Sequence, residues 1–101
     1  MKVVLSTDAR KLVPVSVGDP VILVYRAGCG CSGLHMFAEY ASKASLDSSS
    51  QMLAFEEVGD ASGIPVFMND QLRNYLEHIR CHTLTIEADG SLLILEATSS
   101  S

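Results

Sequence analysis

The sequence predicts a single, mainly β domain with one or two helices packed on its outside. Seven short stretches carry the apolar or alternating patterns of strands, and no βαβ rhythm or internal repeat connects them. The chain has 101 residues, of which 48% are hydrophobic and only 19% are charged, as in a folded chain with one core. We place the domain at residues 1–97 and expect residues 98–101 to fray.

The first quarter of the chain predicts a short strand, a short helix and a central strand. Residues 3–5 are apolar, and Ser6 or Thr7 can cap a helix of at most two turns that has Asp8 in its first turn. Residues 21–26 are apolar on both faces. This pattern predicts a strand that is covered on both sides.

Residues 34–40 alternate between apolar and more polar side chains, which predicts a half-buried strand. The serine-rich residues 41–51 predict a surface loop. Two further strands are expected at residues 52–58 and 64–68, separated by a turn cluster at residues 59–63. Pro65 cannot donate a ladder hydrogen bond, so we expect it at the start of a strand or on an edge.

The last third predicts a helix followed by a hairpin. Asn69 and Asp70 cap a helix that reaches to about Arg80, and its apolar side chains recur with helical spacing and predict packing on the sheet. Those side chains are Leu72, Tyr75, Leu76 and Ile79. Residues 82–88 alternate, Asp89-Gly90 signals a tight turn, and residues 92–95 return as a strand.

Charge and hydropathy argue against several function classes. The net charge is −5 and Lys and Arg are not clustered, so we expect no nucleic-acid or membrane partner. The longest apolar run covers residues 21–25, far fewer than the about 20 residues that span a bilayer, and Asp8 interrupts any signal-peptide core. We therefore expect a cytoplasmic protein with reduced thiols. Because no general base or electrophile stands beside either thiol, we expect no enzyme.

The candidate chemistry is concentrated in residues 27–34, which contain two of the three cysteines and three of the seven glycines. In an extended segment, Cys29 and Cys31 project from the same side, because residues i and i+2 share a face. Thiolates are preferred ligands of iron–sulfur clusters, zinc and copper(I). The pair therefore predicts a soft-metal or cluster site, although a free cysteine also packs as a small hydrophobic residue.

Three other residues are weaker candidate ligands. His78 and Cys81 are three positions apart at the end of the predicted helix, a spacing that can place two ligands on one face. A histidine at this place equally suits the negative end of the helix dipole. His35 either reaches back towards the cysteines or is an ordinary surface histidine. A small acidic group is expected to form a solvated rim, namely Glu56, Glu57 and Asp60.

Several segments resemble, in the same order, the HesB/IscA-type (A-type) iron–sulfur cluster biogenesis domain. They are Thr7-Asp8-Ala9, residues 21–26, Gly30-Cys31-Ser32-Gly33-Leu34, Gly63-Ile64-Pro65-Val66-Phe67 and Tyr75-Leu76. The likeness covers residues 1 to about 97, and its specific part is the Gly-Cys-Ser-Gly-Leu motif. The resemblance implies small β-sheets that form a flattened barrel or sandwich with helices outside. It also implies iron or iron–sulfur cluster binding in a carrier or scaffold role, with Cys31 as the central ligand.

The chain departs from this family at its ligand set. The family's carriers end in a Cys-Gly-Cys tail, whereas this chain has no cysteine after Cys81, so it resembles a short, tail-less member. Cys29 adds a thiol ahead of the motif. Because a cluster takes four protein ligands, two copies of Cys29 and Cys31 in an isologous homodimer would complete the set. Cluster assembly machinery or apo-client proteins would then be the partners.

The alternative is a tail-less domain that binds no cluster. Such a domain would act as a protein-interaction module, or would hold zinc through Cys29, Cys31 and either a histidine or Cys81.

Overall fold

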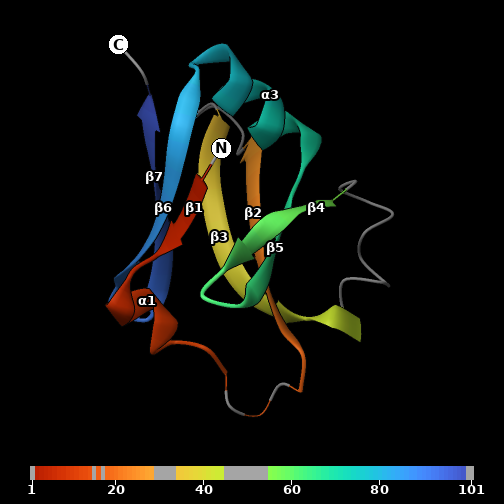
Figure 1. The fold of residues 1–101 in the computed structure, drawn as a ribbon, viewed down its shortest axis with the longest axis vertical. Helices are drawn as coiled ribbons and strands as arrows, with labels where there is room; N and C mark the ends of the chain where they lie inside the picture. The colour runs from red at the N-terminus through yellow and green to blue at the C-terminus, as the bar shows by residue number, and fades with distance from the viewer. Residues whose placement is uncertain (1, 15, 17, 29–33, 45–54, 100–101) are drawn as a thin grey trace.

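The computed structural model describes residues 2–14, 16, 18–28, 34–44 and 55–99. The prediction of a mainly β domain with helices outside is confirmed (Figure 1). The described elements are β1 (Lys2–Leu5), α1 (Thr7–Arg10), β2 (Pro20–Gly28), β3 (Leu34–Ser42), β4 (Glu56–Ala61), β5 (Ile64–Met68), α3 (Asp70–His78), β6 (Cys81–Asp89) and β7 (Leu92–Ser99).

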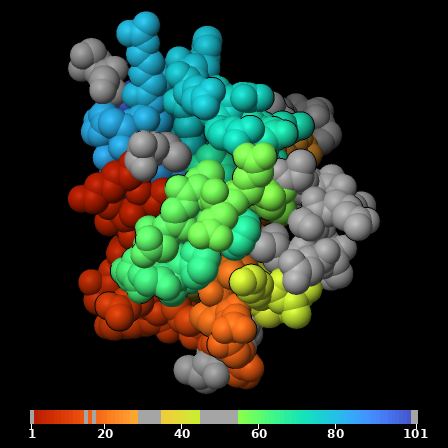
Figure 2. Space-filling model, turned by 45° about the vertical axis from the view of Figure 1, so that its right-hand side comes forward, coloured from red at the N-terminus to blue at the C-terminus, as the bar shows by residue number. Residues whose placement is uncertain are grey.

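The strands form one sheet in the order β1-β6-β7-β3-β2-β5-β4. The β1–β6 and β2–β5 pairs are parallel, and the other neighbouring strands run antiparallel. The sheet curls until its two edge strands, β1 and β4, come into contact. In the space-filling view, β4 lies between the N-terminal segment and α3 (Figure 2). The result is the nearly closed, flattened barrel that was expected.

The central strand β2 is covered on both faces, as predicted. Its inward side chains, Ile22 and Val24, belong to the main core, where Leu84 and Ile86 of β6 and Leu72 of α3 are also buried. Its outward side chains, Val21 and Leu23, belong to a smaller cluster. Half-buried apolar side chains pack against this outer cluster, namely Tyr25, Ala41, Phe55 and Phe67.

Both described helices begin at the predicted caps. The Ser6 hydroxyl accepts a hydrogen bond from the Ala9 amide over 3.1 Å, and α1 is a single turn. The Asn69 side chain accepts from the Leu72 amide over 3.0 Å at the start of α3. No helix among the described residues is both long and apolar enough to cross a membrane.

Several boundaries differ from the sequence prediction, and β3, for example, continues to Ser42, two residues into the predicted loop. The predicted turn cluster at residues 59–63 is mostly strand, because a bulge between Glu57 and Gly59 lets β4 continue to Ala61. Only Ser62 and Gly63, with φ of 52° and 82°, make the turn, and two residues with positive φ suffice for a tight hairpin. Pro65 lies near the start of β5, as expected.

The C-terminal strand extends past the predicted end of the domain at residue 97. Thr98 and Ser99 continue β7 and pair with Thr83 and Cys81 of β6. Residues 100–101 lie outside the described residues, as do residues 52–54 of the predicted fourth strand.

Candidate functional site

The predicted site lies at the end of the β2–β3 hairpin. The two strands are paired without interruption from Pro20 opposite Ser42 to Gly28 opposite Leu34. The hairpin expected around the cysteines is therefore present in its two strands, and the ladder extends to the residue before Cys29. Cys29 and Cys31 themselves belong to the connection 29–33, which lies outside the described residues.

Aromatic side chains line the outward face of this hairpin. Tyr25 stands opposite Phe37 in the ladder, and their rings stack with centroids 5.3 Å apart. Phe55 meets Tyr25 edge-on at 5.9 Å, and the His35 ring is 6.5 Å from that of Phe37. His35 is exposed, as expected for its face of β3. A reach of His35 towards the cysteines stays a prediction.

The inward face of the same hairpin end is fastened to α3. The Asn69 side chain accepts a hydrogen bond from the Arg26 amide and donates one to the Arg26 carbonyl, each over 3.2 Å. The Arg26 guanidinium lies 4.0 Å from the centre of the Tyr75 ring, a cation–π arrangement. Only 4% of Asn69 is exposed. These contacts fix β2 at Arg26, two residues before the strand ends at Gly28.

Sequence reasoning missed this fastening. Asn69 was expected as the cap of α3, which is confirmed, but its bonds to Arg26 join residues 43 positions apart. No local pattern encodes such a contact. The available signal was the choice of Asn for the cap, because an amide can donate and accept at once, whereas the carboxylate of an Asp cap only accepts.

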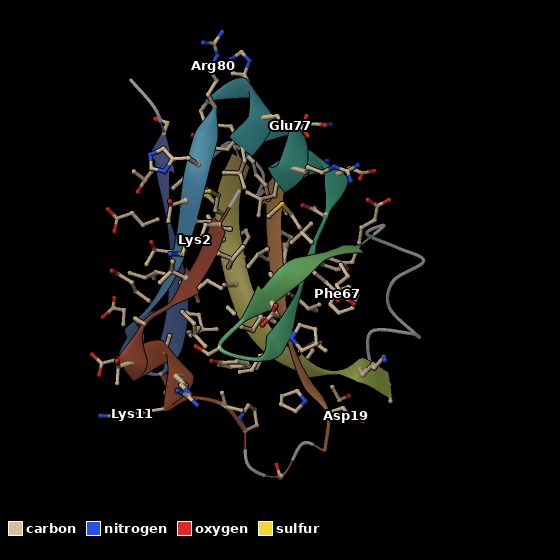
Figure 3. All side chains as sticks on the ribbon, in the orientation of Figure 1. Lys2, Lys11, Asp19, Phe67, Glu77 and Arg80 are labelled. Atoms are coloured by element: carbon tan, nitrogen blue, oxygen red, sulfur yellow. The ribbon has the colours of Figure 1, made fainter. Side chains whose placement is uncertain are left out.

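The shared-helix argument for His78 and Cys81 is wrong. The helix ends at His78, Arg80 takes a positive φ of 55°, and Cys81 opens β6. The thiol of Cys81 is half-buried and donates to the Thr83 carbonyl over 3.2 Å, while His78 is exposed. Arg80 extends away from the barrel at this end of the molecule (Figure 3). His78 and Cys81 therefore lie on two different elements and not on one helix face.

The acidic rim is solvated, as predicted. Glu56, Glu57 and Asp60 are exposed, and Glu56 forms an ion pair with Arg73, which also contacts Asp70 over 2.9 Å. Within the described part of the chain, no three His, Cys, Asp or Glu side chains are grouped so that they could hold a metal ion. A metal site built from described residues alone is thus not found.

No model of a known protein family matches this chain, and no curated protein matches it either. The resemblance to HesB/IscA-type domains therefore stays a prediction that rests on the sequence motifs.

Proposed function

We propose that this chain is an iron–sulfur cluster biogenesis protein that binds iron or a cluster through Cys29 and Cys31 in a carrier or scaffold role. Two features support the proposal. The Gly30-Cys31-Ser32-Gly33-Leu34 motif resembles the central ligand motif of HesB/IscA-type domains. The mainly β barrel with outer helices is also the fold that this resemblance implies.

The observation that carries the proposal most is the pairing of Gly28 with Leu34. Residues that stand opposite each other in an antiparallel ladder have Cα atoms about 4.5–5.5 Å apart. The five residues between them, two of which are cysteines, thus start and end at one place on the central hairpin. A two-residue turn would suffice to close such a hairpin. The connection has three residues more than such a turn needs, and a ligand-binding role for its two cysteines would account for the extra length.

The chemistry requires two copies of the chain. Cys29 and Cys31 offer two thiolates, and a [2Fe–2S] or [4Fe–4S] cluster takes four protein ligands. An isologous dimer with its twofold axis near the hairpin ends would supply Cys₄ at an interface, where a cluster is accessible for transfer. A reducing, cytoplasmic setting would keep these thiols available.

Anaerobic reconstitution with iron and sulfide tests the proposal. We expect one cluster per dimer, with visible absorption that is lost in Cys31→Ser and in Cys29→Ser. Cys81→Ser is the matched control, because a serine hydroxyl can keep the hydrogen bond to the Thr83 carbonyl, and its absorption should equal that of the wild type. A monomer without thiol-dependent absorption would contradict the proposal, and so would equal loss in all three variants.

Elemental analysis of protein purified without air distinguishes the cluster role from the zinc or metal-free alternative. Iron together with sulfide supports the cluster role. Zinc without sulfide, or no metal at all, supports the alternative instead.

A further inference from the structure

An apolar patch lies on the outward face of β3 and β7. Phe37, Leu92 and Ile94 are 38%, 69% and 44% exposed, and they are the large hydrophobic side chains exposed in the described part of the chain. Ala38 and Leu93 are the one paired position between β3 and β7 among the described residues. Phe37 and Ile94 are the next residues along these two antiparallel strands, so they lie beside each other on the outward face.

A groove runs along this seam. It has a volume of about 800 Å³ and is lined chiefly by residues 35–40 of β3 and 92–95 of β7, together with Leu12, Tyr25 and Ser91. Its size falls within the range of ordinary ligand sites. The lining follows β3 over residues 35–40 and β7 over residues 92–95, so an extended segment laid along the two strands would contact it throughout. We call this surface the β3–β7 groove.

Carboxylates frame the groove. In the β6–β7 ladder, Asp89 stands opposite Leu92 and Glu87 stands opposite Ile94, and directly opposite residues share a face. Glu96 follows Ile94 by two positions on the same face. On the other side, Glu39 of β3 is exposed and lies close enough to Tyr25 to raise the pKa of its hydroxyl, after the larger effect of burial.

The strands that carry these carboxylates have no lysine or arginine to balance them. The sequences of β3, β6 and β7 contain neither Lys nor Arg. Lys2 and Lys11 lie instead on β1 and after α1 (Figure 3). The β3–β7 groove is thus apolar along its centre and acidic at its margins.

We propose that the β3–β7 groove is a docking surface for an extended, basic segment of another protein, with apolar side chains in the groove and Lys or Arg side chains on the carboxylate frame. Charge complementarity selects this occupant. A second copy of the chain in an isologous contact would bring two acidic frames together without any lysine or arginine from these strands. All of these residues lie in the described part of the chain, and docking at this groove does not require cluster binding.

Binding of two labelled peptides tests the inference. One is a short peptide of alternating leucine and lysine, and the other has glutamate in place of lysine. Fluorescence anisotropy with the full chain should show that the lysine peptide binds at least about tenfold more tightly than the glutamate peptide. Its affinity should fall as salt is added, because charges at a rim are screened.

Variants should locate the binding. Ile94→Ser and Phe37→Ser should each weaken the lysine peptide about tenfold, since apolar side chains at the centre of an interface contribute most of the affinity. The double variant Glu39→Gln, Glu96→Gln should weaken it a few-fold and reduce its salt dependence. The exposed Glu57 of β4 provides the matched control, and Glu57→Gln should leave the affinity unchanged. The thermal unfolding midpoint of each variant verifies that it is folded.

Three results would overturn the inference. Equal binding of both peptides, or of neither, would remove the charge argument. Equal weakening by Glu57→Gln would place the binding elsewhere. Concentration-dependent dimerisation in sedimentation that Ile94→Ser abolishes would assign the groove to a second copy of the chain.

Discussion

The two faces of the β2–β3 hairpin are built differently. On the inward face, Ile22 and Val24 are completely buried in the main core. On the outward face, Val21 and Leu23 are also buried, but only half-buried side chains such as Phe55 and Phe67 pack against them. Phe67 is visible on β5 in Figure 3. Burial on the outward face therefore depends on neighbours that are themselves in contact with solvent.

The inward face therefore contributes mainly to stability, and the outward face is the one available for binding. The inward face ends in the Asn69 and Arg26 contacts, which hold the hairpin on α3. The outward face continues across the sheet into exposed apolar side chains, Phe37 and then Ile94. Apolar surface that the core does not bury is available for a partner. Substitutions matched across the two faces should show the difference in magnitude.

The largest effect is expected for Asn69→Ala, at about 3 kcal/mol of the free energy of unfolding. The loss combines a helix cap of about 1 kcal/mol with two hydrogen bonds to the Arg26 backbone of about 1 kcal/mol each. Ser6→Ala is the matched control, because Ser6 caps α1 through a single bond, and it should cost about 1 kcal/mol. Urea unfolding measures both. Equal losses would mean that Asn69 acts only as a cap.

The next largest effect compares the same substitution on the two faces of β2. Val24→Ala should destabilise the protein by about 2 kcal/mol, because it leaves a cavity among fully buried neighbours. Val21→Ala should cost about 1 kcal/mol, because half-buried neighbours can move into the space. The free energies of unfolding from urea titrations test this order. A larger loss for Val21→Ala would show that the outer cluster is as tightly packed as the core.

Most of the fold was predictable because hydrophobic periodicity encodes it. The run at residues 21–26 predicted the two-sided burial of β2, and the helical stripe placed Leu72 and Leu76 in the core. The alternation in residues 34–40 predicted the exposed and covered faces of β3. Each of these signals concerns which side of an element meets the core, and a sequence records that directly.

Local reversals and distant contacts were less predictable. The helix stripe continues to Ile79, so the pattern gave no sign that Arg80 would turn with positive φ and place Cys81 in a strand. The fastening of Arg26 by Asn69 depends on strand order, which periodicity does not specify. At the candidate site, the two hairpin strands were predictable, because they are neighbouring segments of the chain and their pairing needs no knowledge of the strand order. The roles of Cys29 and Cys31 remain proposals.

The smallest effect concerns two tyrosines on opposite faces of the hairpin. The Tyr40 hydroxyl donates to the Ala9 carbonyl over 2.7 Å, whereas no hydrogen bond joins the Tyr25 hydroxyl to another residue in the described ranges. At neutral pH, Tyr40→Phe should therefore cost about 1 kcal/mol of stability and Tyr25→Phe close to none. Urea unfolding at pH 7 measures the difference. Equal losses would show that the hydroxyl of Tyr25 also has a partner.

Alkaline pH extends this comparison. Burial raises the pKa of Tyr40, and burial together with Glu39 raises that of Tyr25. Between the unfolded and the folded pKa of each tyrosine, the folded protein holds more protons than the unfolded chain, so stability falls as pH rises above about 10. In each Tyr→Phe variant the free energy of unfolding should fall less steeply as pH rises, and in the double variant it should fall least steeply. An unchanged alkaline decline in the double variant would assign it to groups outside this hairpin. The hairpin's two faces would then differ in packing and hydrogen bonding but not in their response to pH.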